Sequence, residues 1–349
     1  MASPAEADLP PRPSVSMHAM PMGGLLVDVH GLDELSPSAT RITCLWLHHQ
    51  RLGNKERMAD VAARCVAAWN ERSPKTKSRA SPGRGLIALA FDQRNHGTRL
   101  ISDKGNESWN KGNETHAQDM FGIMAGAVVD QGVLIDLVGS YLFRDQPERL
   151  IDRHLALGVS MGGHSVWQLM FAEPRVSAAV VVVGCPDFTY MISDRAKRSK
   201  LSTAVADDGM VSFLGSKDFP PSLVEACRKY DPKCLVFGLT PVPKPSSSPA
   251  PGLGGDLARQ KIEQSLSGKK FLLCSGGEDK LVPYRCSEPF VSWLKDAAGS
   301  WLKHCDISVE DKVYPGVGHT FDVKMIEDAV RFVVDNTESP DVGSPPSKI

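Results

Sequence analysis

The sequence has little that would place it among metal-binding, redox-active or disulfide-stabilised proteins. Its eight cysteines are scattered along 349 residues, and no two of them form a C-x-x-C pair. This spacing argues against a zinc site or a thiol redox motif. Cys44 and Cys274 lie inside apolar runs, where cysteine behaves as a small hydrophobic residue. We therefore expect no metal, no cofactor and a reducing intracellular location, cytoplasmic or peroxisomal.

The sequence also lacks a long hydrophobic run and an excess of either charge. No stretch approaches the ~18 consecutive apolar residues that would span a bilayer, and the N-terminal segment MASPAEADLPPRPSVSM lacks the apolar centre of a secretory signal. With 40 basic and 41 acidic residues the net charge is −1, which does not indicate nucleic acid or an anionic membrane as a partner. The basic run Arg195–Arg198 is interpreted as solvated helix surface.

Short apolar runs rich in branched residues alternate with segments of helical periodicity. Strands are predicted at Leu25–Val29, Ile42–Leu47, Leu86–Phe91, Leu155–Val159, Ala178–Val183, Phe271–Ser275 and Ile307–Val313. Helices are predicted at Lys55–Asn70, Met120–Leu142, from Ser160 through Phe171, at residues 290–297 and at Met325–Val333. Such alternation implies an α/β fold with a mostly parallel sheet covered by helices on both faces.

The alternation is interrupted once, between residues 187 and 267. This segment has no buried-type strand, a predicted helix at Ser222–Tyr230 and a Pro/Ser/Gly-rich stretch at Pro241–Gly255. Because a structureless loop of this length is uncommon in a compact domain, we interpret residues 187–267 as an inserted, partly helical lid. The predicted organisation is a flexible N-terminal arm at 1–22, a core at 23–186 and 268–336, and a flexible tail at 337–349.

Apolar residues in and before the lid have two possible roles, which are lining a substrate pocket and packing the core of the lid. They are Cys185, Phe188, Tyr190, Met191, Phe213 and Phe219.

The segment GVSMGG at residues 158–163 matches the pattern G-x-S-x-G. It follows a predicted buried strand and opens a predicted helix. A serine on this sharp, strained turn needs small residues two positions away on either side, and the turn pushes its hydroxyl out above the sheet. The amide of Met161 then points to the place where an oxyanion would form. We predict that Ser160 is a nucleophile; the alternatives are a glycine-rich turn without chemistry and a phosphate-binding loop.

Four segments together resemble the α/β-hydrolase superfamily. They are GVSMGG around Ser160, FDQRNHGTR after an earlier strand, GGEDKLVP after a later strand and PGVGH before the last helix. The resemblance extends from about Leu25 to Val334 and is most similar to dienelactone-hydrolase-like and prolyl-oligopeptidase-like esterases. It implies an α/β-hydrolase fold, a mostly parallel central sheet flanked by helices with an inserted lid, and a catalytic triad in the chain order Ser, Asp, His.

A serine hydroxyl needs an adjacent base to act as a nucleophile at neutral pH. His319 follows the last predicted strand, in PGVGH, and its loop returns to the edge of the sheet where Ser160 is expected. The implied chain order makes His319 the base and Asp279, in GGEDKLVP, the acid that orients the imidazole. Glu278 and Asp187 are alternative acids, and helix capping is the alternative role for Asp279.

A second oxyanion donor is expected in the loop after the strand Ile42–Leu47. Many members of the superfamily carry His-Gly there, whereas this chain has His48-His49-Gln50. We predict that the amide of Gln50 acts together with that of Met161. The adjacent histidines would point in opposite directions at a strand end, so we expect no metal site. The segment Asp92–Gly97 is expected to brace the loops behind the site.

These residues predict a serine hydrolase that cleaves a carboxylic ester or a thioester of a small acyl substrate through an acyl-serine intermediate. The alternatives are a peptidase or transferase using the same triad, and a non-catalytic binding protein of the same fold. The chain ends in Ser347-Lys348-Ile349, which is similar to the S-K-L peroxisomal address with Ile in place of Leu. We therefore expect the peroxisomal import receptor as a partner.

Overall fold

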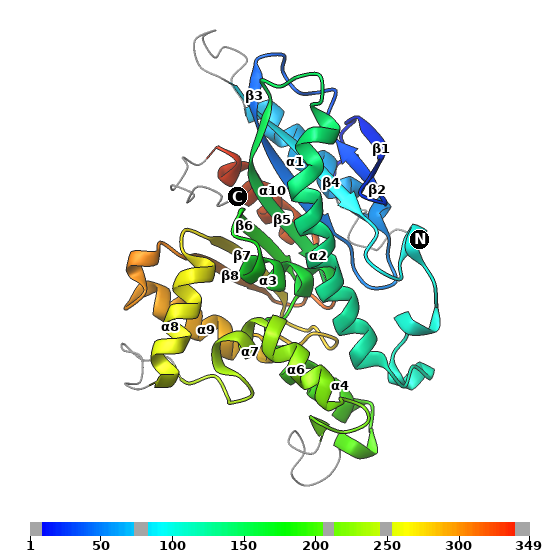
Figure 1. The fold of residues 1–349 in the computed structure, drawn as a ribbon, viewed down its shortest axis with the longest axis vertical. Helices are drawn as coiled ribbons and strands as arrows, with labels where there is room; N and C mark the ends of the chain where they lie inside the picture. The colour runs from blue at the N-terminus through cyan, green and yellow to red at the C-terminus, as the bar shows by residue number, and fades with distance from the viewer. Residues whose placement is uncertain (1–8, 73–82, 205–212, 245–252, 339–349) are drawn as a thin grey trace.

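The computed structural model describes residues 9–72, 83–204, 213–244 and 253–338. An eight-stranded sheet runs through the centre of the molecule (Figure 1). Its strands are β1 (Met17–Met22), β2 (Leu25–His30), β3 (Ala39–His48), β4 (Gly83–Phe91), β5 (Leu150–Val159), β6 (Val176–Val182), β7 (Lys270–Gly276) and β8 (Ser308–Tyr314). The order across the sheet is β1-β2-β4-β3-β5-β6-β7-β8. Strand β2 pairs antiparallel with both of its neighbours, β1 and β4, and all other neighbouring strands pair in parallel.

Each predicted strand is present, because the apolar runs supply side chains for both faces of the sheet. Alternate residues of β3 and β4 enter different cores, as the two-residue period of a strand requires. Trp46 and Leu89 pack on one face, whereas Leu45 and Ala88 pack on the other. Parallel strands covered on both sides are therefore continuously apolar, and such apolar runs predict strands from the sequence.

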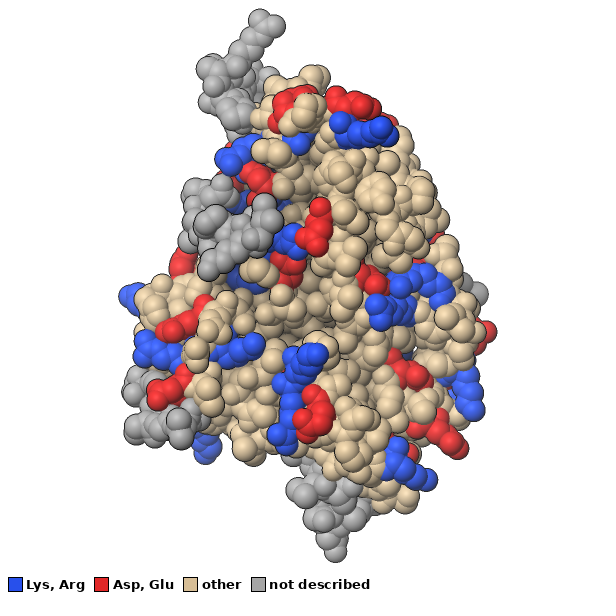
Figure 2. All heavy atoms as spheres, in the orientation of Figure 1, with Lys and Arg blue, Asp and Glu red and all other residues tan. Residues whose placement is uncertain are grey.

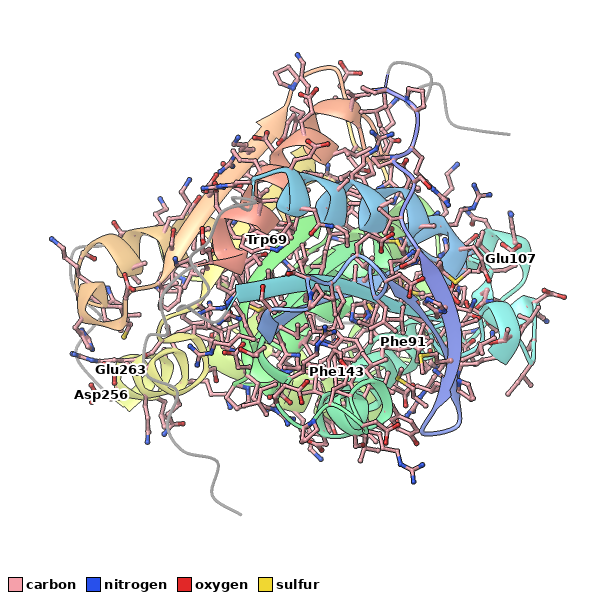
Figure 3. All side chains as sticks on the ribbon, turned by 90° about the horizontal axis from the view of Figure 1, so that it is seen from above. Trp69, Phe91, Glu107, Phe143, Asp256 and Glu263 are labelled. Carbon is pink, nitrogen blue, oxygen red and sulfur yellow. The ribbon has the colours of Figure 1, made fainter. Side chains whose placement is uncertain are left out.

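Helices cover both faces of the sheet. One face carries α1 (Ala59–Arg72) and α10 (Val323–Thr337), and the other carries α2 (His116–Leu142), α3 (Met161–Ala172), α8 (Leu253–Leu266) and α9 (Glu288–Gly299). Figure 3 looks along the layers, with Trp69 on the α1 side and Phe143 on the α2 side. On the face drawn in Figure 2, acidic and basic side chains are interspersed, in keeping with the small net charge.

The predicted insertion divides into two parts in the structure. Helices α4 (Phe188–Arg198) and α6 (Pro221–Tyr230) form a third apolar core with the first turns of α2. After α7 (Pro232–Phe237), helix α8 instead covers the sheet beside α3. Its residues Ala258, Ile262 and Leu266 follow helical spacing and join the core on that face. The segment that can act as a lid thus ends well before residue 267.

Short 3-10 turns complete the described chain. They are η2 (Lys55–Met58), η3 (Gly97–Arg99), η4 (Lys104–Asn106), η5 (Trp109–Lys111), η6 (Ser202–Ala204), η7 (Tyr284–Cys286) and η8 (Lys303–Cys305).

The N-terminal arm is shorter than predicted. Residues 17–22 form β1, which pairs along its whole length with β2. Met22 is fully buried against the core, so hydrogen bonding and burial together fix this segment. The C-terminal tripeptide Ser347-Lys348-Ile349 lies outside the described residues.

Helix α2 is the one helix of the described residues that is long and apolar enough to cross a membrane, with a mean hydropathy of 1.7 over its best window. Half of that window is buried inside the molecule, where α2 packs beside α3. Asp130 and Gln131 interrupt its apolar sequence, so α2 contains no uninterrupted apolar run long enough to span a bilayer. Burial in the core accounts for part of the apolar composition of α2, whereas Val129, Val133, Leu137 and Tyr141 are exposed.

A buried ion pair fixes the loop that follows β3. The Lys55 ammonium donates to Asp28 Oδ1 at 2.7 Å, and both side chains are at most 5% exposed. The backbone N–H of Lys55 donates to Asp92 Oδ1 at 2.9 Å. The end of the loop is thereby tied to β2 and to the segment after β4.

We expect Lys55→Met to lower the free energy of unfolding by about 3–5 kcal/mol, because it leaves the Asp28 carboxylate buried without its cation. The double variant Asp28→Leu/Lys55→Met removes both charges and should lose much less. Denaturant titration of the three proteins measures the difference. Equal losses in the single and double variants would contradict this account of the pair.

Candidate active site

The serine of GVSMGG occupies a strained turn between β5 and α3. Ser160 has φ +54° and ψ −113°, a left-handed conformation that is rare for a residue other than glycine. The turn is held from both sides, because the Ser160 N–H donates to the Val182 carbonyl at 2.8 Å and the Ser160 carbonyl accepts from His164 N–H at 3.0 Å. The surrounding backbone therefore imposes the strain that the sequence pattern predicted.

Two glycines make this turn sterically possible. A Cβ on Gly158 would lie 2.2 Å from the carbonyl oxygen of Gly162. A Cβ on Gly162 would lie 2.2 Å from the carbonyl oxygen of His48, at the end of β3. Both obstacles are backbone atoms, which cannot rotate away. The small residues of G-x-S-x-G thus let α3 begin directly against β3 and β5.

The structure brings together the three residues predicted to act as a triad. Ser160 Oγ lies 2.8 Å from His319 Nε2, and His319 Nδ1 lies 2.7 Å from Asp279 Oδ2. The residues come from the ends of β5, β7 and β8, at one edge of the sheet. The Asp279 side chain is 1% exposed and the His319 ring is 20% exposed. An acid that is out of water thus contacts a base that can reach a substrate.

The alternative acids have other surroundings. The second oxygen of Asp279, Oδ1, accepts from the N–H groups of Leu281 and Val282, at 2.8 and 2.9 Å, and so closes a turn in the loop before η7. Asp279 is not the N-cap of a helix, because that position is Pro283 in η7 and Ser287 in α9. Glu278 is exposed. Asp187 instead caps α4, accepting from Tyr190 N–H at 2.9 Å.

The paired histidines after β3 brace the loop, as expected for His48. His48 Nε2 lies 2.5 Å from Gln131 Oε1 on α2. His49 Nε2 accepts from Gln93 N–H at 3.1 Å, and Asp92 accepts from the N–H of Lys55. Burial lowers the pKa of His48 and that of His49 to about 4 each. Both rings are therefore neutral at pH 7 and brace the loop. His49 stands at the position of the glycine in the His-Gly pattern.

The two predicted oxyanion donors differ in their placement. Met161 is the first residue of α3, so its N–H has no acceptor within the helix, and it lines the cavity beside Ser160. Gln50 does not line that cavity, and its carbonyl closes a turn by accepting from Gly53 N–H at 3.0 Å. The neighbouring residue Arg51 forms part of the cavity wall instead. An oxyanion role for Gln50 stays a prediction.

A cavity of about 210 Å³ opens over the serine. Ser160, Met161 and His319 contribute to it from the sheet edge. Most of the other lining residues are polar. The loop after β3 supplies Arg51, the loop before α2 supplies Ser108 and Asn110, and α4 and the residue after it supply Arg195, Arg198 and Ser199. The wall is therefore largely polar, with Met120 and Leu281 as its other apolar members.

Of the two roles considered for the apolar residues in and before the lid, the structure supports packing in an apolar core. Of the proposed residues, Cys185, Phe188, Met191, Phe213 and Phe219 belong to the third core, and none of them lines the cavity. The interpretation of Arg195 as solvated surface was wrong, because it is partly buried in the cavity wall. Its spacing from Phe188 and Met191 follows the buried face of α4, a periodicity that the charge of the run obscured.

The fold has counterparts among solved structures. No protein-family model and no curated protein matches the chain. The chain is similar to TT1662 from Thermus thermophilus, with 16% identity, a TM-score of 0.53 and coverage of 94% of this chain and 100% of the other. It also overlays on Est1E from Butyrivibrio proteoclasticus, solved with ferulic acid (16% identity, TM-score 0.44, coverage 90% and 95%), and on acetyl xylan esterase 1 from Thermoanaerobacterium (14%, 0.46, 94% and 89%).

The strand order, the antiparallel β2 and a strained serine after β5 decide the fold. The chain has the α/β-hydrolase fold. In this α/β-hydrolase fold the serine, the acid and the histidine follow β5, β7 and β8, the chain order that the sequence resemblance implied.

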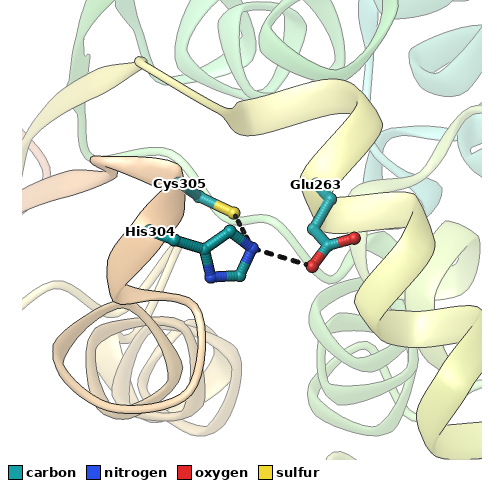
Figure 4. A group of neighbouring side chains, drawn as sticks. All are labelled: Glu263, His304 and Cys305. Atoms are coloured by element: carbon teal, nitrogen blue, oxygen red, sulfur yellow. Dashed lines mark hydrogen bonds and ion pairs between the residues drawn. The ribbon is translucent and has the colours of Figure 1, made fainter.

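The α/β-hydrolase core carries one group of three potential metal ligands among its described residues. Glu263 on α8 meets His304 and Cys305 of η8, with His304 Nε2 3.0 Å from Glu263 Oε1 (Figure 4). The same carboxylate oxygen accepts from Arg259 at 2.8 Å, so a guanidinium already neutralises it. None of these residues lines the cavity at Ser160.

The strained turn at Ser160 gives a steric prediction. Gly162→Ala should lower the free energy of unfolding by about 1–3 kcal/mol, because its Cβ would overlap the His48 carbonyl. It should also suppress labelling of Ser160 by a fluorophosphonate. The matched control is Gly122→Ala on α2, where nothing lies within 4 Å of the new Cβ and helix propensity favours alanine. Equal stability and labelling of the two variants would contradict the close contact.

Proposed function

We propose that the protein is a serine hydrolase that cleaves a carboxylic ester or thioester of a small substrate through an acyl-serine intermediate. The observation that carries the proposal is the continuous hydrogen-bond chain from Ser160 to His319 at 2.8 Å and from His319 to Asp279 at 2.7 Å. An ionised Asp279 accepts from Nδ1–H, which leaves Nε2 of His319 free to accept the serine proton.

Acylation begins when Ser160 Oγ attacks the carbonyl carbon of the substrate. The hydroxyl proton moves to His319 Nε2, and the carbonyl oxygen becomes an oxyanion facing the N–H of Met161. Asp279 stabilises the imidazolium that forms. When the tetrahedral intermediate collapses, the bond to the leaving group breaks and His319 gives its proton to the departing alkoxide or thiolate.

Deacylation repeats these steps with water as the nucleophile. His319 removes a proton from water, the resulting hydroxide attacks the acyl-serine, and the ester bond to Ser160 breaks. His319 returns the proton to Ser160 Oγ, and the carboxylic acid leaves. Apart from the substrate and water, both halves of this reaction use only groups of the chain itself.

The intact triad favours hydrolysis over the non-catalytic alternative. A binding protein that had lost its chemistry would have no need of a strained serine, a bonded imidazole and a buried carboxylate in one chain. A peptidase or a transferase would use the same acylation step and differ in its leaving group or its acceptor.

The first test is the hydrolysis of 4-nitrophenyl acetate by the wild type and by Ser160→Ala. We expect the substitution to lower kcat by about 10⁴-fold or more, since it removes the nucleophile, and to abolish fluorophosphonate labelling. A folded wild type that neither hydrolyses the ester nor reacts with the fluorophosphonate would overturn the proposal.

The acid is tested by Asp279→Asn, with Glu278→Gln as the matched neighbour. Asp279→Asn should lower kcat by about 10³- to 10⁴-fold, because an amide favours the wrong tautomer of His319. Glu278→Gln changes an exposed side chain and should retain activity within about threefold. Comparable losses in both variants would assign the defect to the loop rather than to the acid.

A further inference from the structure

Positive charge in the cavity wall is not matched by negative charge. Three guanidinium groups, those of Arg51, Arg195 and Arg198, share the cavity with the Ser160 hydroxyl. Only Arg198 has an ion-pair partner, Asp194 at 2.9 Å. Among the described residues, no carboxylate lies within ion-pair distance of Arg51 or Arg195.

Neutral acceptors hold Arg195 in place. One of its NH groups donates to His116 Nε2 at 3.2 Å and another to the Leu281 carbonyl at 3.4 Å. Two methionine sulfurs complete its contacts, those of Met120 and Met191. These contacts orient the guanidinium but supply no compensating charge.

His116 does not offset the positive charge of Arg195. Its imidazole carries no negative charge, and both of its ring nitrogens are engaged in hydrogen bonds. Its Nδ1 donates to the Glu107 carbonyl at 2.8 Å, which leaves Nε2 to accept from Arg195. Burial and the two nearby guanidiniums of Arg195 and Arg51 lower the pKa of His116 to about 3. The ring is therefore neutral at pH 7.

Arg51 is held in the same way. It donates to the carbonyl oxygen of Asn106 at 2.7 Å. The carboxylate that most raises the pKa of Arg51 is Glu107, which pairs with Lys111. The carboxylate that most raises the pKa of Arg195 is Asp279, which contacts His319. Burial, together with the like charges of Arg51 and Arg198, lowers the pKa of Arg195 to about 10. Arg195 remains a cation at pH 7, in an environment that disfavours its charge.

We propose that the substrate carries a carboxylate within a few bonds of its scissile carbonyl, and that Arg195 and Arg51 bind this carboxylate. This proposal rests on the proposed hydrolase function and narrows its substrate class. A substrate carboxylate placed between the two guanidiniums would compensate their charge and accept charge-assisted hydrogen bonds from them.

Cavity size selects the chemistry of the anion. Ser160 and both arginines line one cavity of about 210 Å³. The anionic group and the reacting carbonyl must therefore belong to the same small part of the substrate. The phosphates of coenzyme A lie at the far end of its pantetheine arm and do not fit this requirement. A planar carboxylate also matches the fork of a guanidinium.

The test compares pairs of esters that differ in charge but hardly in shape. Monoethyl succinate is paired with ethyl 4-oxopentanoate, and acetoxyacetate with acetoxyacetone, so that the anion lies on the acyl side in one pair and on the alcohol side in the other. Hydrolysis is followed by proton release at pH 7.5. In the wild type, we expect kcat/KM for the anion of at least one pair to exceed that of its neutral partner by roughly 10- to 100-fold.

Arg195→Met tests the assignment to this residue. The ratio of kcat/KM for the anionic ester to that for the neutral ester should fall by roughly tenfold or more, while the neutral ester stays a substrate. Misfolding would instead lower both rates together. The matched control is Arg285→Met, which removes a positive charge from an arginine that pairs with Asp194 at 2.7 Å and does not line the cavity. Its ratio should equal that of the wild type.

A second measurement uses the wild type alone. Succinate should slow the labelling of Ser160 by a fluorophosphonate, whereas succinamide and inorganic phosphate at equal concentration and ionic strength should not. Protection by phosphate alone would overturn the carboxylate assignment.

A wild type that hydrolyses the neutral esters as well as the anionic ones would refute the arginine site while leaving the hydrolase proposal intact. A wild type that is inert toward every ester and toward the fluorophosphonate would instead refute the proposed function itself.

Discussion

The contact between the start of α3 and the end of β3 constrains the whole site. Gly162 touches the carbonyl of His48 so closely that no side chain fits between them. This contact fixes the left-handed turn at Ser160 and places the first N–H of α3 beside the serine hydroxyl. The same strand end leads into the loop that carries Arg51. One close backbone approach thus sets the positions of the Ser160 hydroxyl, the Met161 N–H and one cation of the cavity wall.

The loop after β3 lacks the glycine of the His-Gly pattern and is held by side chains instead. His48 and His49 are both buried and neutral, and they hydrogen-bond to Gln131 and to the Gln93 N–H. Two rigid rings thereby hold the loop where backbone freedom would otherwise be needed. The buried Lys55–Asp28 pair fixes its far end. The departure from the His-Gly pattern is therefore compatible with a rigid cavity wall.

The sequence was informative wherever one physical requirement dominated. Continuous apolar runs predicted the strands, and the glycines around Ser160 predicted a strained turn. It was less informative where two requirements compete at one residue. Arg195 has a charge typical of surface and a position on the buried face of α4, so its charge and its helical spacing predict opposite environments. The proline-rich sequence before residue 17 favours a flexible arm, because the pairing of β1 with β2 is a contact between strands that no local pattern contains.

The uncompensated guanidiniums also bear on how the lid is held. Arg195 lies on the same face of α4 as Phe188, which packs against Phe219 in the third apolar core. Burial of those rings favours the present position of α4, whereas repulsion between Arg195 and Arg51 opposes it. The apolar core outweighs this repulsion in the structure, because the cations are held by neutral acceptors at fixed positions. An anion in the cavity would turn repulsion into attraction, so its binding and the present position of α4 would stabilise each other.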